Sequence, residues 1–258
     1  SLEGNPLEPP FNQVRRQPYG DLAIVAFLDS QAVELDLAGC SFMDLPESLT
    51  THSRELRALN LSDNILHTLP EWSTGFQNLT SLVLDNNRFR EFPEEVCLLR
   101  SLEVLSISKT EISDISPQIV DLDRLKKLAL DSNDIRELPK CLVLMKTLEV
   151  LQVSNNKIEE LPLSIGNLTN LHVLDVSCND IEHLPPSLGD LSRLEVLDAK
   201  INQLREVPEE IGECDQLRHL NLSNNAIVAL PKRFGRLKDL VALKLAANCL
   251  LYTSPSPR

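Results

Sequence analysis

The sequence predicts an α/β solenoid, in which one short strand-and-turn unit stacks on copies of itself. Three observations predict it: one column of residues recurs every 23 positions, a Leu-x-Leu pattern precedes it, and a Leu-Pro step follows it. The column reads Asn64, Asn87, Thr110, Asn133, Asn156, Asn179, Asn202, Asn225 and Asn248. An unbroken period over about 185 residues is not a feature of an ordinary globular core, and it places function on an extended surface.

The Leu-x-Leu segment predicts a short strand in each unit. Examples are Leu82-Val-Leu84, Leu151-Gln-Val153 and Leu174-Asp-Val176. A strand has a side-chain period of two, so the two apolar residues are buried and the residues between them point the other way. Ten such segments can be counted, and the first, at Glu34–Leu37, has Cys40 in the Asn column.

The residues after each strand predict a turn and a short helical segment. An Asn carboxamide can both donate and accept hydrogen bonds, so stacked Asn side chains can satisfy backbone groups where the chain leaves the strand. The Pro of each Leu-Pro step, as in Leu138-Pro139, ends local pairing and can open a short helical turn. In repeat four, Thr110 replaces Asn and Ser116-Pro117 shifts the proline by one position, which is either ordinary drift or a local bend.

Together these features resemble the leucine-rich repeat family over roughly residues 33–248. The resemblance implies a horseshoe with a parallel concave β-sheet and short helices or 3-10 turns on the convex side. The repeat length and the Leu-Pro step are similar to those of intracellular Ras-pathway scaffold proteins and plant Ras-group-related repeat proteins. A monomer that binds a protein partner, such as a small GTPase or a phosphatase, is therefore expected.

Both ends of the chain fall outside the repeat domain, which we assign to residues 32–248. Residues 1–31 are expected to be an extended linker and a cap for the first repeat. Residues 249–258 resemble one reading frame of a transposase adapter oligonucleotide, and we interpret them as non-native; the alternative is a genuine Ser/Pro-rich tail. Without a capping end, Leu243 and Leu245 are expected to be poorly covered.

The formal net charge of −13 disfavours nucleic acid and anionic membranes as partners. Carboxylates cluster beside the Leu-Pro steps, where they either solvate the edge of the array or form a site for basic partners. They are Glu91, Glu94, Glu95, Glu137, Glu159, Glu160, Glu206, Glu209 and Glu210. The six cysteines are scattered through the repeats instead of paired at the ends, which favours reduced thiols and a cytoplasmic location.

Outward-facing strand residues of repeats five to eight are the predicted contact zone for a protein partner. The predicted site residues are Asp131, Gln152, Ser154, Val173, Asp175, Ser177, Val196, Asp198, Lys200, His219 and Asn221. Asp175 and Asp198 are predicted to be exposed, and the valines to supply apolar area. No Trp, Tyr or Phe falls in these columns, so a modest affinity is expected. The alternative is that these residues only solvate the sheet.

Motifs for catalysis are absent from the sequence: it has no Gly-rich phosphate loop, no Gly-x-Ser-x-Gly, no His-Glu-x-x-His and no Cys-x-x-Cys. No enzyme activity, cofactor or metal is therefore predicted. The sequence favours a non-catalytic protein-interaction module of an intracellular signalling scaffold. The alternative is the recognition domain of a larger kinase, phosphatase, cyclase, ubiquitin ligase or immune receptor.

Overall fold

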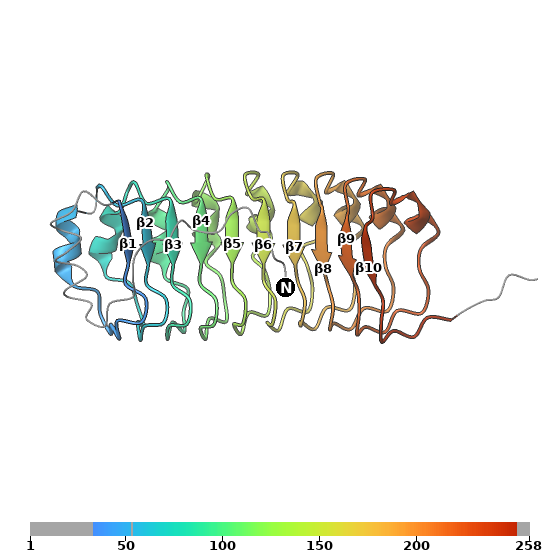
Figure 1. The fold of residues 1–258 in the computed structure, drawn as a ribbon, viewed down its shortest axis with the longest axis horizontal. Helices are drawn as coiled ribbons and strands as arrows, with labels where there is room; N and C mark the ends of the chain where they lie inside the picture. The colour runs from blue at the N-terminus through green and yellow to red at the C-terminus, as the bar shows by residue number, and fades with distance from the viewer. Residues whose placement is uncertain (1–32, 53, 252–258) are drawn as a thin grey trace, which may run out of the picture.

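The computed structural model describes residues 33–52 and 54–251, which form one elongated repeat array (Figure 1). Within these residues ten parallel strands lie side by side in sequence order in a single open sheet. The strands are β1 (Glu34–Asp36), β2 (Ala58–Asn60), β3 (Ser81–Val83), β4 (Val104–Ser106), β5 (Lys127–Ala129), β6 (Val150–Gln152), β7 (Val173–Asp175), β8 (Val196–Asp198), β9 (His219–Asn221) and β10 (Ala242–Lys244). The predicted solenoid is confirmed.

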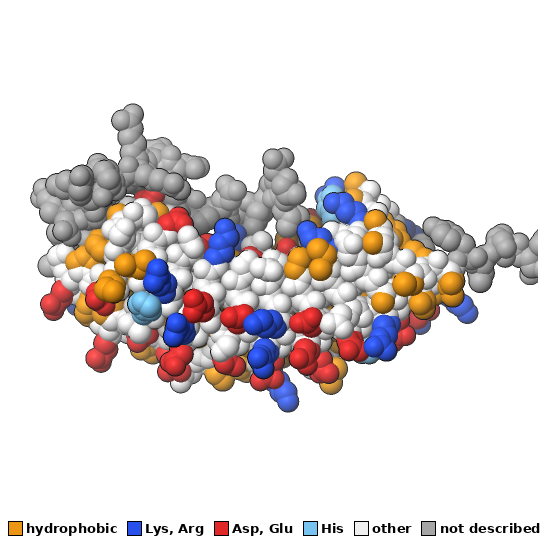
Figure 2. All heavy atoms as spheres, turned by 90° about the horizontal axis from the view of Figure 1, so that it is seen from below, with side chains coloured by type: hydrophobic (Ala, Val, Ile, Leu, Met, Phe, Trp, Pro, Cys, Tyr) orange, Lys and Arg blue, Asp and Glu red, His pale blue; other side chains and the backbone are white. Residues whose placement is uncertain are grey.

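Short 3-10 helices lie on the opposite side of the array from the sheet (Figure 1). They are η1 (Glu47–His52), η2 (Glu71–Gly75), η3 (Glu94–Leu98), η4 (Pro117–Asp121), η5 (Lys140–Leu144), η6 (Ile165–Asn167), η7 (Pro186–Asp190), η8 (Glu209–Glu213) and η9 (Lys232–Arg236). Pro139 precedes η5 with φ −60° and ψ 133°, an extended conformation from which the helical turn opens. Viewed from below, the outer surface of the array is convex (Figure 2).

The core is a stack of leucines and related apolar residues that runs the length of the array. Successive strands pair in register, so that Leu128 faces Leu151 and Leu151 faces Leu174. These leucines are fully buried, as the period-two pattern predicts. Each repeat therefore buries its apolar side chains against the repeat before it and the repeat after it.

The Asn column forms a hydrogen-bonded ladder beneath the sheet. The Nδ2 of Asn156 donates to the carbonyl of Val153 in its own repeat at 3.1 Å and to that of Leu130 in the preceding repeat at 2.9 Å. Its Oδ1 accepts the amide of Ile135 at 3.0 Å. Two donated bonds and one accepted backbone bond recur at every ladder residue: Asn64, Asn87, Asn133, Asn156, Asn179, Asn202, Asn225 and Asn248.

Repeat four has Thr110 in place of the ladder Asn, as repeat one has Cys40. The amide and the hydroxyl of Thr110 both donate to Oδ1 of Asn133, the next ladder residue. Strand β4 nevertheless pairs in register with β3 and β5, so the sheet continues unchanged across the repeat. This continuity favours ordinary sequence drift over a local bend.

The residue before each ladder position has a left-handed backbone, with φ between 53° and 60°. Asn and Asp tolerate this conformation, and Asn86, Asn155 and Asn224 occupy it in three repeats. Ile201 has the same conformation with φ 53°. Because a β-branched side chain is strained there, Ile201 is a local weak point of repeat eight.

The last described strand is less covered than the others. Leu243 of β10 is 39% exposed and Leu245 is partly buried, which confirms the expectation for these two leucines. The predicted linker and cap at residues 1–31 lie outside the described residues, as do residues 252–258 of the tail. None of the helices in the described part has the length and apolar character needed to cross a membrane.

Candidate protein-binding face

The concave sheet face is built by the strand residues that alternate with the buried leucines. In β7 and β8, Leu174 and Leu197 point into the core, and the residues on either side of them point away from it. Val173 is paired with Val196 and Asp175 with Asp198. Neighbouring strands lie about 4.8 Å apart, so outward side chains of successive repeats form continuous rows.

The structure brings the predicted site residues together on five neighbouring strands. Asp131 follows β5, Gln152 and Ser154 lie in and just after β6, and Lys200 follows β8. The set is Asp131, Gln152, Ser154, Val173, Asp175, Ser177, Val196, Asp198, Lys200, His219 and Asn221. Of these residues, His219 is the exposed one and the others are half-buried or buried.

Two expectations about this face are wrong. Asp175 and Asp198 were expected to be exposed, but both are half-buried, and the Asp198 side chain is only 15% exposed. Closely spaced strands and hydrogen bonds to the following turn hold these carboxylates against the sheet. Ser177 is 3% exposed, so its side chain offers almost no surface to a partner.

The apolar area of the face is also smaller than expected. Val150 is 3% exposed, and Val83 and Ala129 are buried as well. Val173 and Val196 are half-buried and give the face its remaining valine surface within the predicted zone. Within the predicted zone the valines therefore contribute less accessible surface than expected.

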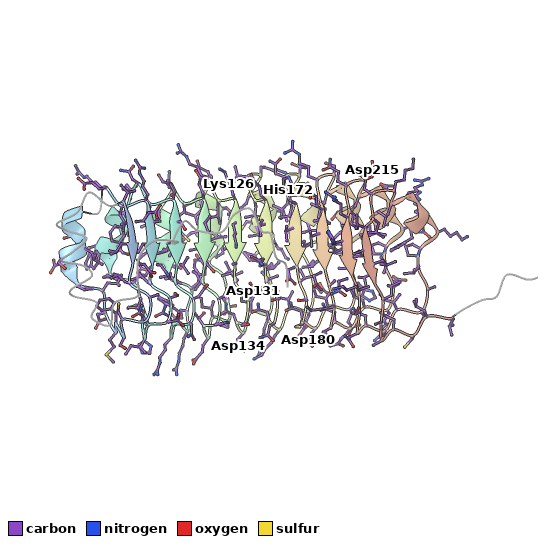
Figure 3. All side chains as sticks on the ribbon, in the orientation of Figure 1. Lys126, Asp131, Asp134, His172, Asp180 and Asp215 are labelled. Atoms are coloured by element: carbon purple, nitrogen blue, oxygen red, sulfur yellow. The ribbon has the colours of Figure 1, made fainter. Side chains whose placement is uncertain are left out.

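Asp131 lies near the mid-length of the array, just beyond the end of β5 (Figure 3). Its Oδ1 accepts hydrogen bonds from the backbone amide and from the hydroxyl of Ser154, both at 2.8 Å. Burial raises the pKa of the Asp131 carboxyl, and the charge of Asp85 adds to this effect. The Ser154 hydrogen bonds and Lys127 act in the opposite direction.

Asp175 and Asp198 each accept the backbone amide two residues further along the chain. The Ser177 amide donates to Oδ1 of Asp175 at 3.0 Å, and the Lys200 amide donates to Oδ1 of Asp198 at 3.1 Å. Oδ2 of Asp198 accepts from the Asn221 amide group at 3.1 Å and lies 3.7 Å from Nζ of Lys200. Burial raises the pKa of Asp175, and the charges of Asp198 and Asp131 raise it further.

Asp85 is a carboxylate of the same kind that was missing from the predicted site. Oδ1 of Asp85 accepts the Ser106 hydroxyl and the Ser108 amide, both at 2.7 Å, and burial raises its pKa. The alternation of Asp85, Ser108, Asp131 and Ser154 at one repeat position is the sequence signal that marks it. We define the carboxylate row as Asp85, Asp131, Asp175 and Asp198.

Metal binding has no support in the described part of the chain, where no group of three or more His, Cys, Asp or Glu side chains is placed to hold an ion. The face instead carries half-buried carboxylates, of which Asp198 already lies 3.7 Å from Nζ of Lys200. Carboxylates of this kind form charge-assisted hydrogen bonds with Arg and Lys. The side chains of this face are therefore mainly polar and ionic.

Comparison with known families agrees with the repeat geometry. Leucine rich repeat models match residues 30–89 and 77–135, a two-copy model matches residues 146–186, and a single-repeat model matches residues 216–237. The chain belongs to the leucine-rich repeat family. No curated protein sequence matches this leucine-rich repeat chain significantly.

Solved structures of several leucine-rich repeat proteins are similar to the chain. A leucine-rich repeat protein of Leptospira interrogans is 26% identical, with 91% of this chain and 77% of that protein covered and a TM-score of 0.65. The ectodomain of the plant membrane receptor kinase GASSHO1/SCHENGEN3 from Arabidopsis thaliana, in complex with CASPARIAN STRIP INTEGRITY FACTOR 2, is 32% identical, with 82% and 27% covered and a TM-score of 0.69.

TLR13, in complex with ssRNA13, is 29% identical, with 81% of this chain and 31% of TLR13 covered and a TM-score of 0.69. The leucine-rich repeat chain thus spans less than a third of each of the two receptors. Their complexes show that similar arrays bind quite different ligands.

Proposed function

We propose that the chain is a non-catalytic protein-interaction module of an intracellular signalling scaffold, and that it binds its partner on the concave sheet face. The observation that carries the proposal is the carboxylate row. Each of its members has one oxygen engaged by a backbone amide of the sheet face. The row is thereby preorganised, and a partner that brings Lys or Arg side chains completes it.

The size of the face suits a folded protein or an extended peptide. Ten strands at about 4.8 Å spacing give a surface about 43 Å long, enough for an interface of standard size. The 23-residue Leu-Pro subclass, with its resemblance to Ras-pathway scaffolds, favours a small GTPase or a phosphatase as the partner. The negative net charge disfavours RNA.

A second candidate function is the recognition domain of a larger enzyme or receptor. The similarity to the ectodomain of a receptor kinase favours it, since that array occurs together with other domains in one protein. Reading the complete transcript distinguishes the two candidates: a kinase, phosphatase, cyclase or ubiquitin-ligase domain, or the nucleotide-binding domain of an immune receptor, in the same reading frame supports the second.

The test of the concave face uses substitutions that keep side-chain shape. Because Asp175 and Asp198 are half-buried, Asp→Asn removes charge without introducing a larger group. We expect the Asp175→Asn/Asp198→Asn variant to bind a partner isolated by affinity capture and then purified at least about fivefold more weakly, measured by calorimetry.

The matched control removes two charges from the convex side. Asp121 and Asp215 are exposed, and Asp121→Asn/Asp215→Asn should leave the affinity within about twofold of the original protein. Equal affinity of the Asp175→Asn/Asp198→Asn variant and the original protein would exclude the concave face as the binding site.

A further inference from the structure

A second recessed surface lies away from the sheet face, at the edge where the chain leaves β6 and β7. It is a hollow of about 780 Å³ formed by the turns of repeats six and seven. Asp180, one of its lining residues, lies on the lower edge of the array in Figure 3, and Figure 2 looks onto that edge. Buried Leu161 and Leu184 form its apolar floor.

The hollow coincides with a break in the surface pattern of the array. The residue that opens each convex turn is charged in most repeats. It is Glu71, Glu94, Lys140, Glu209 and Lys232 in repeats two, three, five, eight and nine. In repeats four, six and seven it is Pro117, Leu163 and Pro186, and the last two, which are adjacent in the array, line the hollow.

Leu163 is openly exposed to solvent. It is 81% exposed, the most exposed of the large apolar side chains in the described part of the chain. Helix η6 starts only at Ile165 and has three residues, whereas η5 and η7 have five, so Leu163 lies in a turn ahead of the helix. An apolar side chain left in water beside an apolar floor, with a polar rim, is typical of a binding surface.

The rim of the hollow is acidic. Glu159, Glu160, Asp180 and Glu182 line it and are exposed, and no Lys or Arg is among the lining residues. Asp180 accepts a hydrogen bond from Gln203 at 3.0 Å, and Glu182 lies 3.5 Å from Arg205.

Glu159 and Glu160, by contrast, form no ion pair within the described residues. Two adjacent carboxylates without counter-charges attract cations at the mouth of the hollow. The acidic rim and the apolar floor together indicate the chemistry of the segment that the hollow would bind.

We propose that this hollow binds a partner segment in which apolar side chains are flanked by Lys or Arg. The apolar side chains contact Leu163 and the leucine floor, and the basic groups pair with the acidic rim. The site is independent of the concave face, so the array can hold two partners, or two parts of one partner, at once.

Fluorescence polarisation with two labelled peptides tests the proposal on the full chain. One peptide is Lys-Arg-Leu-Leu-Arg-Lys, and the other has Ser in place of both Leu. The first should bind at least about fivefold more tightly, since only it fills the apolar floor. Leu163→Gln, which leaves the net charge unchanged, should abolish that difference, and because Leu163 is so exposed the variant should fold normally.

Charge-matched variants separate the hollow from general attraction to an acidic protein. Glu159→Gln/Glu160→Gln should weaken binding of the Leu peptide about fivefold, whereas Glu91→Gln/Glu94→Gln, an equal charge change on exposed residues outside the hollow, should change it less than about twofold.

The Asp175→Asn/Asp198→Asn variant should bind the Leu peptide as the original protein does, which separates this site from the concave face. Equal binding of the two peptides, or equal losses in the two glutamate variants, would overturn the proposal.

Discussion

Strands β6 and β10 have the same sequence pattern and nearly the same ladder hydrogen bonds, but their strand leucines are buried to very different degrees. Asn156 and Asn248 each donate to the preceding repeat at 2.9 Å and to their own repeat at 3.1 and 3.0 Å. Leu151 of β6 is fully buried, whereas Leu243 of β10 is 39% exposed. Hydrogen bonding is thus set by each repeat and its predecessor, while apolar burial needs a neighbour on both sides.

Leucine truncation should give the largest difference between these two regions. Leu151→Ala leaves a cavity in the continuous core and should lower the free energy of unfolding by about 3 kcal/mol. Leu243→Ala removes a side chain that is already partly in water and should cost less than about 1.5 kcal/mol. Urea denaturation followed by circular dichroism measures both. Equal losses would show that β10 is as well packed in solution as β6.

Ladder truncation should give a smaller difference of the same sign. Asn156→Ala leaves the Ile135 amide without its partner and removes one of the two ladder donors from each of the Leu130 and Val153 carbonyls, so it should destabilise the array by about 2 kcal/mol. Asn248→Ala affects equivalent groups that water can reach more easily, since Asn248 is half-buried, and should cost about 1 kcal/mol. Hydrogen exchange of the Ile135 and Ile227 amides reports each site directly. If both amides lose protection equally, the burial of the ladder residue does not determine how much its hydrogen bonds stabilise the array.

Relief of backbone strain should stabilise repeat eight but not repeat six. Ile201 and Asn155 have the same left-handed φ of 53°, and only the first is β-branched. Ile201→Asn should therefore raise the free energy of unfolding by about 1 kcal/mol, while Asn155→Ser should have a small effect of the opposite sign. Thermal unfolding of the two variants tests this. A loss of stability in Ile201→Asn would mean that the isoleucine makes packing contacts worth more than the strain.

The buried charge of the sheet face should give the smallest stability effect, and it should depend on pH. The folded-state pKa of Asp131 is raised above its ordinary 3.8, so the folded protein holds this proton more tightly than the unfolded chain does. The charged form therefore weakens the fold at neutral pH, and the penalty disappears as pH falls through the raised pKa toward 3.8.

Asp131→Asn should accordingly be slightly more stable than the original protein at pH 7, with the difference shrinking in acid. Asp114→Asn, the same change at an exposed position of repeat four, is the control. A constant difference from pH 7 to acid would show that burial does not perturb Asp131. Binding of a cationic partner should weaken over the same acidic range, because protonation neutralises Asp85, Asp131 and Asp175, whose pKa values are all raised.

The repeat architecture could be predicted from the sequence because the same pattern of leucines and asparagine recurs in nearly every repeat. The Leu-x-Leu spacing within each strand predicted that Leu151 and Leu174 are buried. The ladder position of Asn156 followed from its fixed distance along the sequence to the strand leucine of its own repeat. The local environment of the sheet face could not be predicted in the same way. That Ser177 is buried and that Asp198 accepts a backbone amide depend on the spacing of neighbouring strands and on turn geometry.

The hollow of repeats six and seven shows a similar limit. The sequence reveals that Leu163 and Pro186 interrupt a charged column. It does not reveal that η6 starts late, which leaves Leu163 outside the helix and beside the leucine floor. Only the three-dimensional arrangement turns an irregularity of pattern into a candidate site.

The ladder has a consequence for the evolution of such proteins. From Asn87 onward, each ladder Asn donates to a carbonyl 26 residues earlier, as Asn179 does to Val153 and Asn202 to Val176, so these bonds connect one unit to its immediate predecessor. Duplicating or deleting a complete 23-residue module would recreate the same junction on both sides of the change. Genetic recombination can therefore add or remove whole repeats without breaking the hydrogen bonds between the repeats that remain. The length of the sheet face can thus change in steps of one strand.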